Sequence, residues 1–264
     1  MFDETEDHDH AHTQNRFAVI PTPEKLNADP QFTGKGIRIA FLDSGFFPHP
    51  DIHDRIVTFH DVSGGQNELH QRLEPQSFQW HGTQTTVSCA GNGKLCDGIY
   101  RGIASEAELV LVRVSDENGA IPDQNIELGL QWILENREKY NIRVLNMSLG
   151  GDANLPSAES KIDQLAEECV KQGIVVIVAA GNSADNVPIP PANSPSVITV
   201  GGYSDENQFD EADFELYHSS FGVTADGTIK PEVIAPAMFV AAPILPKTAD
   251  YIAAETLAHL LTQP

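Results

Sequence analysis

The chain has 264 residues, of which 41% are hydrophobic and 20% are charged, and this composition is typical of a globular protein with a sizeable core. Its 16 Lys and Arg against 38 Asp and Glu give a net charge of -22, which argues against nucleic acid and anionic membrane surfaces as partners. The longest apolar run, Ile174 to Ala180, is far shorter than the roughly 20 residues of a membrane-spanning helix, which excludes such a helix.

The N-terminal segment, residues 1–30, is polar, acidic and interrupted by prolines, and it has no sustained helical or strand period. We therefore expect an extended or mobile arm. Histidines alternate with aspartates over residues 7–12, a pattern that can bind transition metals, although a solvated tail is the favoured interpretation. The segment has neither a basic start nor an apolar run, so it does not resemble a secretory signal, and we expect a cytoplasmic protein.

The three cysteines, Cys89, Cys96 and Cys169, are an odd number and lack the two-residue spacing of common zinc sites. They predict neither a disulfide framework nor a zinc site, and we expect buried free thiols. Cys89 and Cys169 fall in predicted helical segments with apolar neighbours, which disfavours a role as a nucleophile.

Short apolar runs alternate with helical patterns from Gly36 onward. The runs lack strict polar alternation, as expected of strands that are buried on both faces. The predicted strands are Ile37 to Leu42, Leu109 to Val114, Arg143 to Met147, Ile174 to Ala180 and Val197 to Gly201.

Apolar stripes at helical spacing predict two amphipathic helices, over residues 126–134 and 162–170. For the second helix, Ser157 is the expected N-cap and Gly173 the expected stop. A small-residue helix is also predicted from Trp80 to Ala90. This alternation predicts an α/β fold with three layers, a mostly parallel central sheet with helices on both faces, in which polar residues at the carboxyl ends of strands carry the chemistry.

Two polar motifs follow the first predicted strand and open the small-residue helix. Asp43 ends the strand, and a carboxylate at a buried strand end needs hydrogen-bond donors or a cation. His81 lies at a helix start, where neighbouring N–H groups disfavour the protonated ring and leave an imidazole that can act as a general base. Taken singly, a turn aspartate satisfied by amides and a structural histidine are the alternatives.

Two more motifs follow later strands. The strand ending at Met147 continues into Ser148, Leu149 and Gly150, where a flexible backbone can pair with an extended peptide. The next strand runs into Asn182, whose side-chain amide can donate to a developing oxyanion, with a turn-stabilising role as the alternative.

The order of these motifs is jointly specific: Asp-Ser-Gly, His-Gly-Thr, Asn-Met-Ser-Leu-Gly, Ala-Ala-Gly-Asn-Ser, Ser-Ser-Phe-Gly and Lys-Pro-Glu-Val-Ile-Ala-Pro. The chain resembles the subtilisin-like serine peptidases over roughly residues 36 to 247. The resemblance implies a subtilisin-like α/β domain over 31–247 and a serine endopeptidase acting on a polypeptide substrate. It implies that Asp43 orients and stabilises the ring of His81, that His81 is the general base, and that Asn182 is the oxyanion donor.

The resemblance further implies that Ser148, Leu149 and Gly150 line the substrate, and that the Ser-Ser-Phe-Gly motif is a packing turn. Many members of this family bind calcium. Asp116 to Gly119 offers oxygen ligands in a predicted turn, but its spacing does not match a defined calcium loop, so a solvated turn is favoured and no cofactor is expected.

The chain departs from the family at the nucleophile, which the family places in a Gly-Thr-Ser motif after Ala235-Pro236. No Gly-Thr-Ser occurs in the chain, and its last serine is Ser220. Thr256 is a weak substitute because its neighbours match nothing in the motif. We interpret residues 248–264 as the start of a helical insertion and expect the fold to be incomplete at the C-terminus, as in the N-terminal portion of a longer protein.

Two functions of different class follow. In the first, the chain belongs to a serine endopeptidase whose serine comes from missing sequence or from a second chain, because this chain alone lacks the nucleophile that acyl-enzyme chemistry requires. In the second, it is a non-catalytic pseudopeptidase that binds extended peptides at the segment from Ser148 to Gly151. A nucleotide-binding domain is disfavoured, because no phosphate-binding glycine motif follows the first strand.

Overall fold

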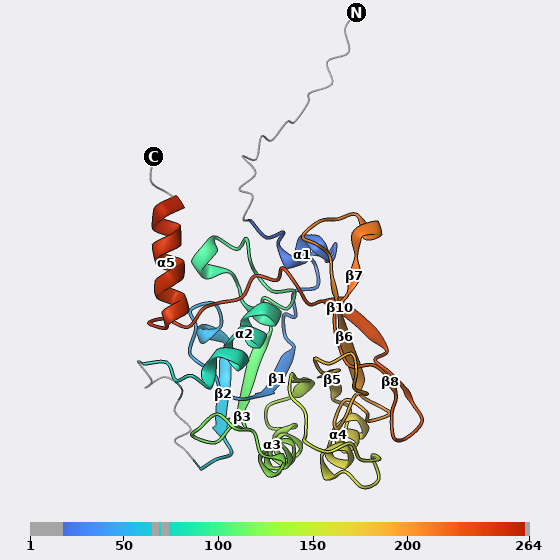
Figure 1. The fold of residues 1–264 in the computed structure, drawn as a ribbon. Helices are drawn as coiled ribbons and strands as arrows, with labels where there is room; N and C mark the ends of the chain where they lie inside the picture. The colour runs from blue at the N-terminus through green and yellow to red at the C-terminus, as the bar shows by residue number, and fades with distance from the viewer. Residues whose placement is uncertain (1–17, 65–68, 70–73, 262–264) are drawn as a thin grey trace, which may run out of the picture.

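The computed structural model describes residues 18–64, 69 and 74–261, and a twisted central sheet dominates this part of the chain (Figure 1). The parallel strands follow the order β10-β6-β5-β4-β1-β3-β2, and β7 pairs antiparallel with β6. The strands of this sheet are β1 (Arg38–Asp43), β2 (Ile56–Asp61), β3 (Glu108–Arg113), β4 (Ile142–Met147), β5 (Val175–Ala179), β6 (Ile198–Ser204), β7 (Glu215–Leu216) and β10 (Val233–Pro236). A separate antiparallel pair joins β8 (Gly222–Val223) to β9 (Ile229–Lys230).

Helices cover both faces of the sheet, which confirms the predicted three-layer α/β arrangement (Figure 1). The α-helices are α1 (Thr22–Lys25), α2 (Gln79–Ala90), α3 (Asp123–Asn136), α4 (Lys161–Lys171) and α5 (Ala249–Leu261). The short 3-10 turns are η1 (His53–Arg55), η3 (Lys94–Cys96) and η4 (Glu211–Asp213). None of the helices within the described residues has the length and apolar character needed to cross a membrane.

The five predicted strands correspond to β1, β3, β4, β5 and β6, and their parallel pairing is confirmed. The observed strands begin and end within a few residues of the predicted bounds. β2 lay outside the prediction because Ile56–Asp61 contains three polar residues and shows little apolar run. It nevertheless pairs in parallel with β3 at the edge of the sheet.

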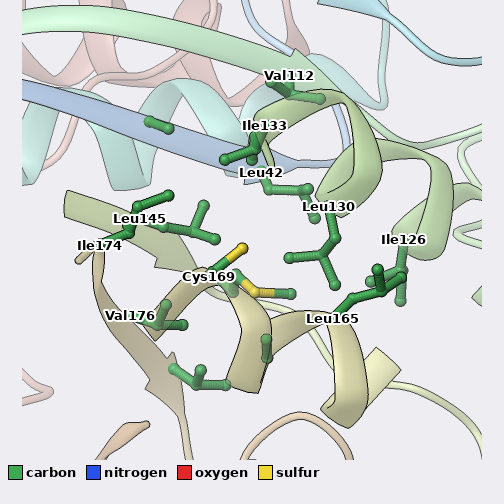
Figure 2. Close-up of a cluster of buried hydrophobic side chains, with 14 of the residues drawn as sticks. Leu42, Val112, Ile126, Leu130, Ile133, Leu145, Leu165, Cys169, Ile174 and Val176 are labelled. Carbon is green, nitrogen blue, oxygen red and sulfur yellow. The ribbon is translucent and has the colours of Figure 1, made fainter. Parts of the chain in front are cut away.

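One face of the sheet packs against α3 and α4 through a large buried cluster (Figure 2). Leu130 and Ile133 of α3 point toward Leu42 of β1, and Cys169 of α4 lies beside Leu145 of β4 (Figure 2). Each fully buried leucine or isoleucine in such a core contributes about 1.5–3 kcal/mol relative to exposure. The opposite face carries a second cluster in which side chains of α2 meet those of β1 and β3.

The start of α4 differs from the prediction in its capping residue. The N-cap is Ser160, whose Oγ accepts from Asp163 N at 3.1 Å, and the expected cap, Ser157, lies one turn earlier. Ser157 instead donates its backbone N–H to the carboxylate of Asp226 at 2.9 Å. Sequence patterns cannot foresee this choice, since Asp226 is 69 positions away. The predicted stop is confirmed, because Gly173 follows the helix with a φ of +84°.

The described part of the predicted N-terminal arm is docked onto the domain rather than extended. Residues 22–25 form the short helix α1, and Lys25 makes an ion pair of 2.7 Å with Asp205, both side chains being nearly fully buried. Lys25 also donates to the carbonyl of Phe239. The histidine-aspartate tract lies outside the described residues.

The cysteines are free thiols, as predicted; Cys169 is fully buried, Cys89 is partly buried against the second core cluster, and Cys96 is partly buried. Burial raises the pKa of Cys89 to about 11 and that of Cys169 to about 12. Both side chains therefore stay protonated at neutral pH, and neither is a ready nucleophile.

The β10 edge and α5 leave much apolar surface exposed. β10 pairs only with β6, and Val233 and Ile234 are 47% and 50% exposed. α5 falls within residues 248–264, the expected start of a helical insertion; none of its residues is fully buried, and it stands apart from the sheet (Figure 1).

Candidate active site

Asp43 is held at the carboxyl end of β1, and its side chain is only 1% exposed. Oδ1 accepts from Ser44 N at 2.7 Å, and Oδ2 accepts from the hydroxyl of Thr85 at 3.1 Å. These donors offset the cost of burying a carboxylate. The sequence signalled Asp43 but not Thr85, because the contact depends on how α2 packs against β1.

His81 lies in the first turn of α2, which places its ring against Asp43. Nδ1 lies 2.7 Å from Asp43 Oδ1. Gly82 permits this approach: a Cβ at its position would lie 2.2 Å from Gly45 O and 3.1 Å from the Cβ of Asp43. Two residues 38 positions apart in the chain are thereby joined, as the resemblance implies.

The protonation of His81 is governed by the carboxylate. The hydrogen bond to Asp43 raises the pKa of His81 above its ordinary value of 6.5, and burial opposes it. The helix start was expected to favour the neutral ring, so the direction differs from that expectation because the carboxylate is closer. With its Nδ1 proton donated to Asp43, the neutral ring presents Nε2 as a proton acceptor.

An open cavity of about 420 Å³ brings together three of the predicted site residues, His81, Ser148 and Asn182. They come from α2, from the end of β4 and from the end of β5, which are all at the carboxyl edge of the sheet. The prediction that chemistry gathers at this edge fits the placement of these side chains.

The other two predicted substrate residues are placed differently. Leu149 is partly buried against the core cluster rather than lining this cavity. Gly150 is exposed, and a Cβ there would lie 3.5 Å from the carbonyl oxygen of Pro190. The segment therefore offers one side chain, Ser148, to the cavity and an exposed backbone beyond it.

Asn182 lies in a turn that Ser220 holds on both sides. The backbone N–H of Ser220 donates to Gly181 O at 3.1 Å, and its Oγ accepts from Ser183 N at 3.4 Å. Gly181 has a φ of +106°, and a Cβ there would lie 2.7 Å from Ser220 Oγ. The sequence predicted a packing turn around Ser220, but not which residues it packs against.

No hydroxyl group of the described residues forms a hydrogen bond with Nε2 of His81, although Ser88, Ser148 and Ser219 line the same cavity. Ser219 is engaged elsewhere, since its Oγ accepts from Gly202 N at 2.8 Å. Thr256, the weak substitute, is on α5 and donates to Ile252 O within that helix.

In the turn from Asp116 to Gly119, which was considered for calcium, the carboxylate of Asp116 accepts hydrogen bonds from nearby backbone N–H groups. Asp116 Oδ1 accepts from Asn118 N at 2.8 Å and from Ala120 N at 3.0 Å. Across the residues that the structure describes, no group of three or more His, Cys, Asp or Glu side chains is placed to hold a metal ion. Asp116 Oδ1 is therefore engaged by backbone N–H groups of its own turn.

Comparison with known proteins agrees with this geometry. The model of the subtilase family matches residues 34–260, so the chain belongs to the subtilase family of serine proteases. It is 38% identical to serine protease AprX of Bacillus subtilis (strain 168) over 77% of this chain and 47% of that protein. It is 32% identical to subtilisin E of the same organism, over 75% of this chain and 50% of that protein.

Solved structures share the fold. The structure titled Sphericase superposes with a TM-score of 0.69 and 23% identity, covering 92% of this chain and 83% of that one. A cold-adapted subtilisin-like serine proteinase superposes with a TM-score of 0.59 over 79% of this chain and 65% of that one, also at 23% identity. The chain spans about half the length of the curated relatives it matches first.

Proposed function

We propose that residues 31–247 form the acid-base and oxyanion part of a subtilisin-like serine endopeptidase, whose nucleophilic serine is supplied from outside the 264 residues. The observation that carries this proposal is the 2.7 Å contact between His81 Nδ1 and Asp43 Oδ1 at the wall of a cavity that Asn182 also lines. A buried carboxylate, a histidine and an amide donor in this arrangement suit acyl transfer.

The roles of the residues follow from their atoms. Nε2 of His81 would take the proton of the serine hydroxyl as its oxygen attacks the peptide carbonyl carbon. Asp43 would stabilise the imidazolium that forms, and the side-chain N–H of Asn182 would donate to the oxyanion. His81 would then return the proton to the leaving amine, and water would release the acyl group by the same route in reverse.

The surface around the cavity supports a nucleophile that comes from another segment. A second cavity, of about 790 Å³, runs along β6 and β10, and both cavities are lined by Gly201, Gly202, Tyr217 and Ser219. Apolar side chains of Ile234 and Met238 face this second cavity and remain exposed. A serine-bearing segment that covered this surface would bury it and would reach His81.

A chimera tests the proposal. Residues 1–236 of this chain are joined to the continuation of a subtilase that starts after its own Ala-Pro motif and contains its Gly-Thr-Ser motif. We expect the chimera to hydrolyse peptides and the 264-residue chain to be inactive. His81→Ala in the chimera should lower kcat by about six orders of magnitude, the effect of losing such a base.

The matched control is His53→Ala, which removes an exposed histidine from η1. It should leave kcat within a factor of two of the parent chimera. A folded chimera without activity, or one whose activity survives His81→Ala, would contradict the proposal.

Peptide binding without hydrolysis is the second candidate function, favoured by the exposed backbone around Gly150 next to the cavity. It requires that the 264-residue chain bind extended peptides by calorimetry. Loss of that binding on Ser148→Trp, which would fill the cavity, would locate the peptide there. A stable chain that binds no member of a diverse peptide library would exclude this candidate.

A further inference from the structure

Asp163 is a buried carboxylate that the proposed chemistry does not use. It lies in the first turn of α4, its side chain is fully buried, and neither of its carboxylate oxygens has a hydrogen-bond partner among the described residues. Oδ1 of Asn193, which is also fully buried, is another oxygen without a partner. Buried polar atoms in folded proteins are nearly always paired, so this cluster calls for a physical reason.

The charged groups around Asp163 are acidic. Asp226 approaches from the loop between β8 and β9, and Glu167 lies on the next turn of α4. Asp123, at the start of α3, lies beside Gly151, where an added Cβ would be 3.1 Å from Asp123 Oδ1 and 3.3 Å from Ile162 Cδ1. The nearby Lys161 of α4 is exposed. Within the part of the chain that the structure describes, the charged groups that act on Asp163 are therefore acidic, and none is a cation.

Two effects compete for the proton of Asp163. The N-terminal turn of a helix favours a carboxylate, and the nearby polar side chains of Ser160 and Asn193 also lower the pKa of Asp163, although neither forms a hydrogen bond with its carboxylate oxygens. Burial without a partner favours the neutral acid, and the acidic neighbours add to it. Burial is the larger effect and raises the pKa of Asp163 to about 7.

The position of Asp163 gives its charge a structural consequence. The start of α4 meets the loop that follows β4 and the loop that follows β5. Asn193 Nδ2 donates to Leu155 O at 2.8 Å, and Gly151 N donates to Pro190 O at 2.8 Å, so the two loops are tied together beside Asp163. These loops follow β4 and β5, and they carry Ser148 and Asn182.

We propose that Asp163 is a pH-sensitive packing residue, which holds a proton while the start of α4 is packed against these two loops and which loosens that junction when it ionises. The proposal goes beyond peptide hydrolysis and does not depend on it. It concerns the stability of this chain, whatever the source of the nucleophile.

The sign of the pH dependence follows from linkage. An unfolded aspartate releases its proton near pH 3.9, as ordinary aspartates do, whereas the folded state keeps it to about pH 7. Between these values the folded state binds one more proton than the unfolded state. The ratio of folded to unfolded chain therefore falls about tenfold per pH unit from about pH 4 to pH 7 because of Asp163, and levels off above that.

The test compares the wild-type 264-residue chain with Asp163→Asn, which has the shape of the neutral acid and cannot ionise. Denaturant unfolding is measured from pH 4.5 to 8. The stability of wild type relative to Asp163→Asn should fall about tenfold per pH unit between pH 4.5 and 6.5. Asp152→Asn, which removes an exposed charge, should retain the wild-type slope. Parallel profiles for wild type and Asp163→Asn would overturn the proposal.

A second measurement needs no variant. The carboxyl carbon of Asp163 in the wild-type chain is followed by NMR as the pH is raised. We expect its titration near pH 7, together with faster hydrogen exchange, corrected for the intrinsic pH effect, in the loops after β4 and β5. Titration below pH 5 would overturn the proposal.

Discussion

The region around β1 and α2 and the region around β6 and β10 differ in how well their side chains are covered and paired. On the side of β1 and α2, Asp43 is buried and fully supplied with donors, and His81 is fixed against it at 2.7 Å. On the side of β6 and β10, apolar side chains such as Ile234 remain half exposed beside a cavity of about 790 Å³. Asp43 and His81 are thus held in place by contacts within this chain, whereas the apolar side chains beside β6 and β10 remain exposed.

This difference separates two requirements of a serine protease. The acid-base pair needs only local packing, which a glycine at position 82 and a threonine at position 85 provide. We propose that the nucleophile comes from a further segment that covers the β6–β10 region. Under the function that we propose, a single further segment that carries the serine would both cover the exposed apolar face and complete the site of Asp43 and His81.

The largest effect in this comparison is expected on kcat, from a substitution in the β1–α2 region. In the chimera, Asp43→Asn should lower kcat by about four orders of magnitude, because the amide would donate to Nδ1 and favour the wrong tautomer of His81. Steady-state kinetics measure this. Asp213→Asn, at an exposed aspartate of η4 that the chimera retains, is the control and should leave kcat unchanged. If kcat of the Asp43→Asn chimera were within tenfold of the parent value, the proposed role of Asp43 would be contradicted.

A pair of stability variants contrasts the two sides directly. Leu130→Ala, in the buried cluster of α3, should lower the free energy of unfolding by about 2–5 kcal/mol. Ile234→Thr, on the exposed face of β10, should change it by less than about 0.5 kcal/mol in the 264-residue chain. Urea unfolding measures both, and equal losses would show that the β10 side is not open.

Most strands and helices could be predicted because short stretches of sequence carry their apolar patterns. Buried strands such as Leu109 to Val114 are continuous apolar runs, and α3 and α4 carry apolar stripes. β2 could not be predicted, since an edge strand needs no such run. The cap of α4 was wrong because Ser157 is bonded to Asp226, a contact made only in the folded chain.

In the candidate site, the motif residues could be predicted, but the contacts that hold them could not. Asp43, His81 and Asn182 were found because short motifs mark them in a specific order. The hydrogen bond from Thr85 to Asp43 and the bond between Ser220 and the turn that holds Asn182 were not predicted. In both cases the partners are distant in sequence. Leu149 was expected at the substrate, but it packs against the core cluster.

A smaller effect is expected from the oxyanion donor. Asn182→Ala in the chimera should lower kcat by about 10²–10³ with little change in KM, because the amide acts on charge that develops only in the transition state. Asn186→Ala, a nearby exposed asparagine, should have no such effect. A rise in KM with kcat unchanged would mean that Asn182 binds the ground state instead.

The smallest effect concerns pH. The hydrogen bond to Asp43 raises the pKa of His81, so NMR of the 264-residue chain should show this ring titrating above pH 6.5, and Asp43→Asn should lower its pKa. The protonated pair stabilises the fold below pH 6.5, and this contribution should fade as the pH rises through the folded pKa. The effect should be small because the side chain is 36% exposed. Titration below pH 6.5 would contradict it.

Labelling by a fluorophosphonate probe tests the central claim most directly, with the labelled residue located by mass spectrometry. We predict that the 264-residue chain is not labelled, and that the chimera is labelled at the serine of its Gly-Thr-Ser motif in a manner that requires His81. Labelling of a serine or threonine in the 264-residue chain would contradict an external nucleophile.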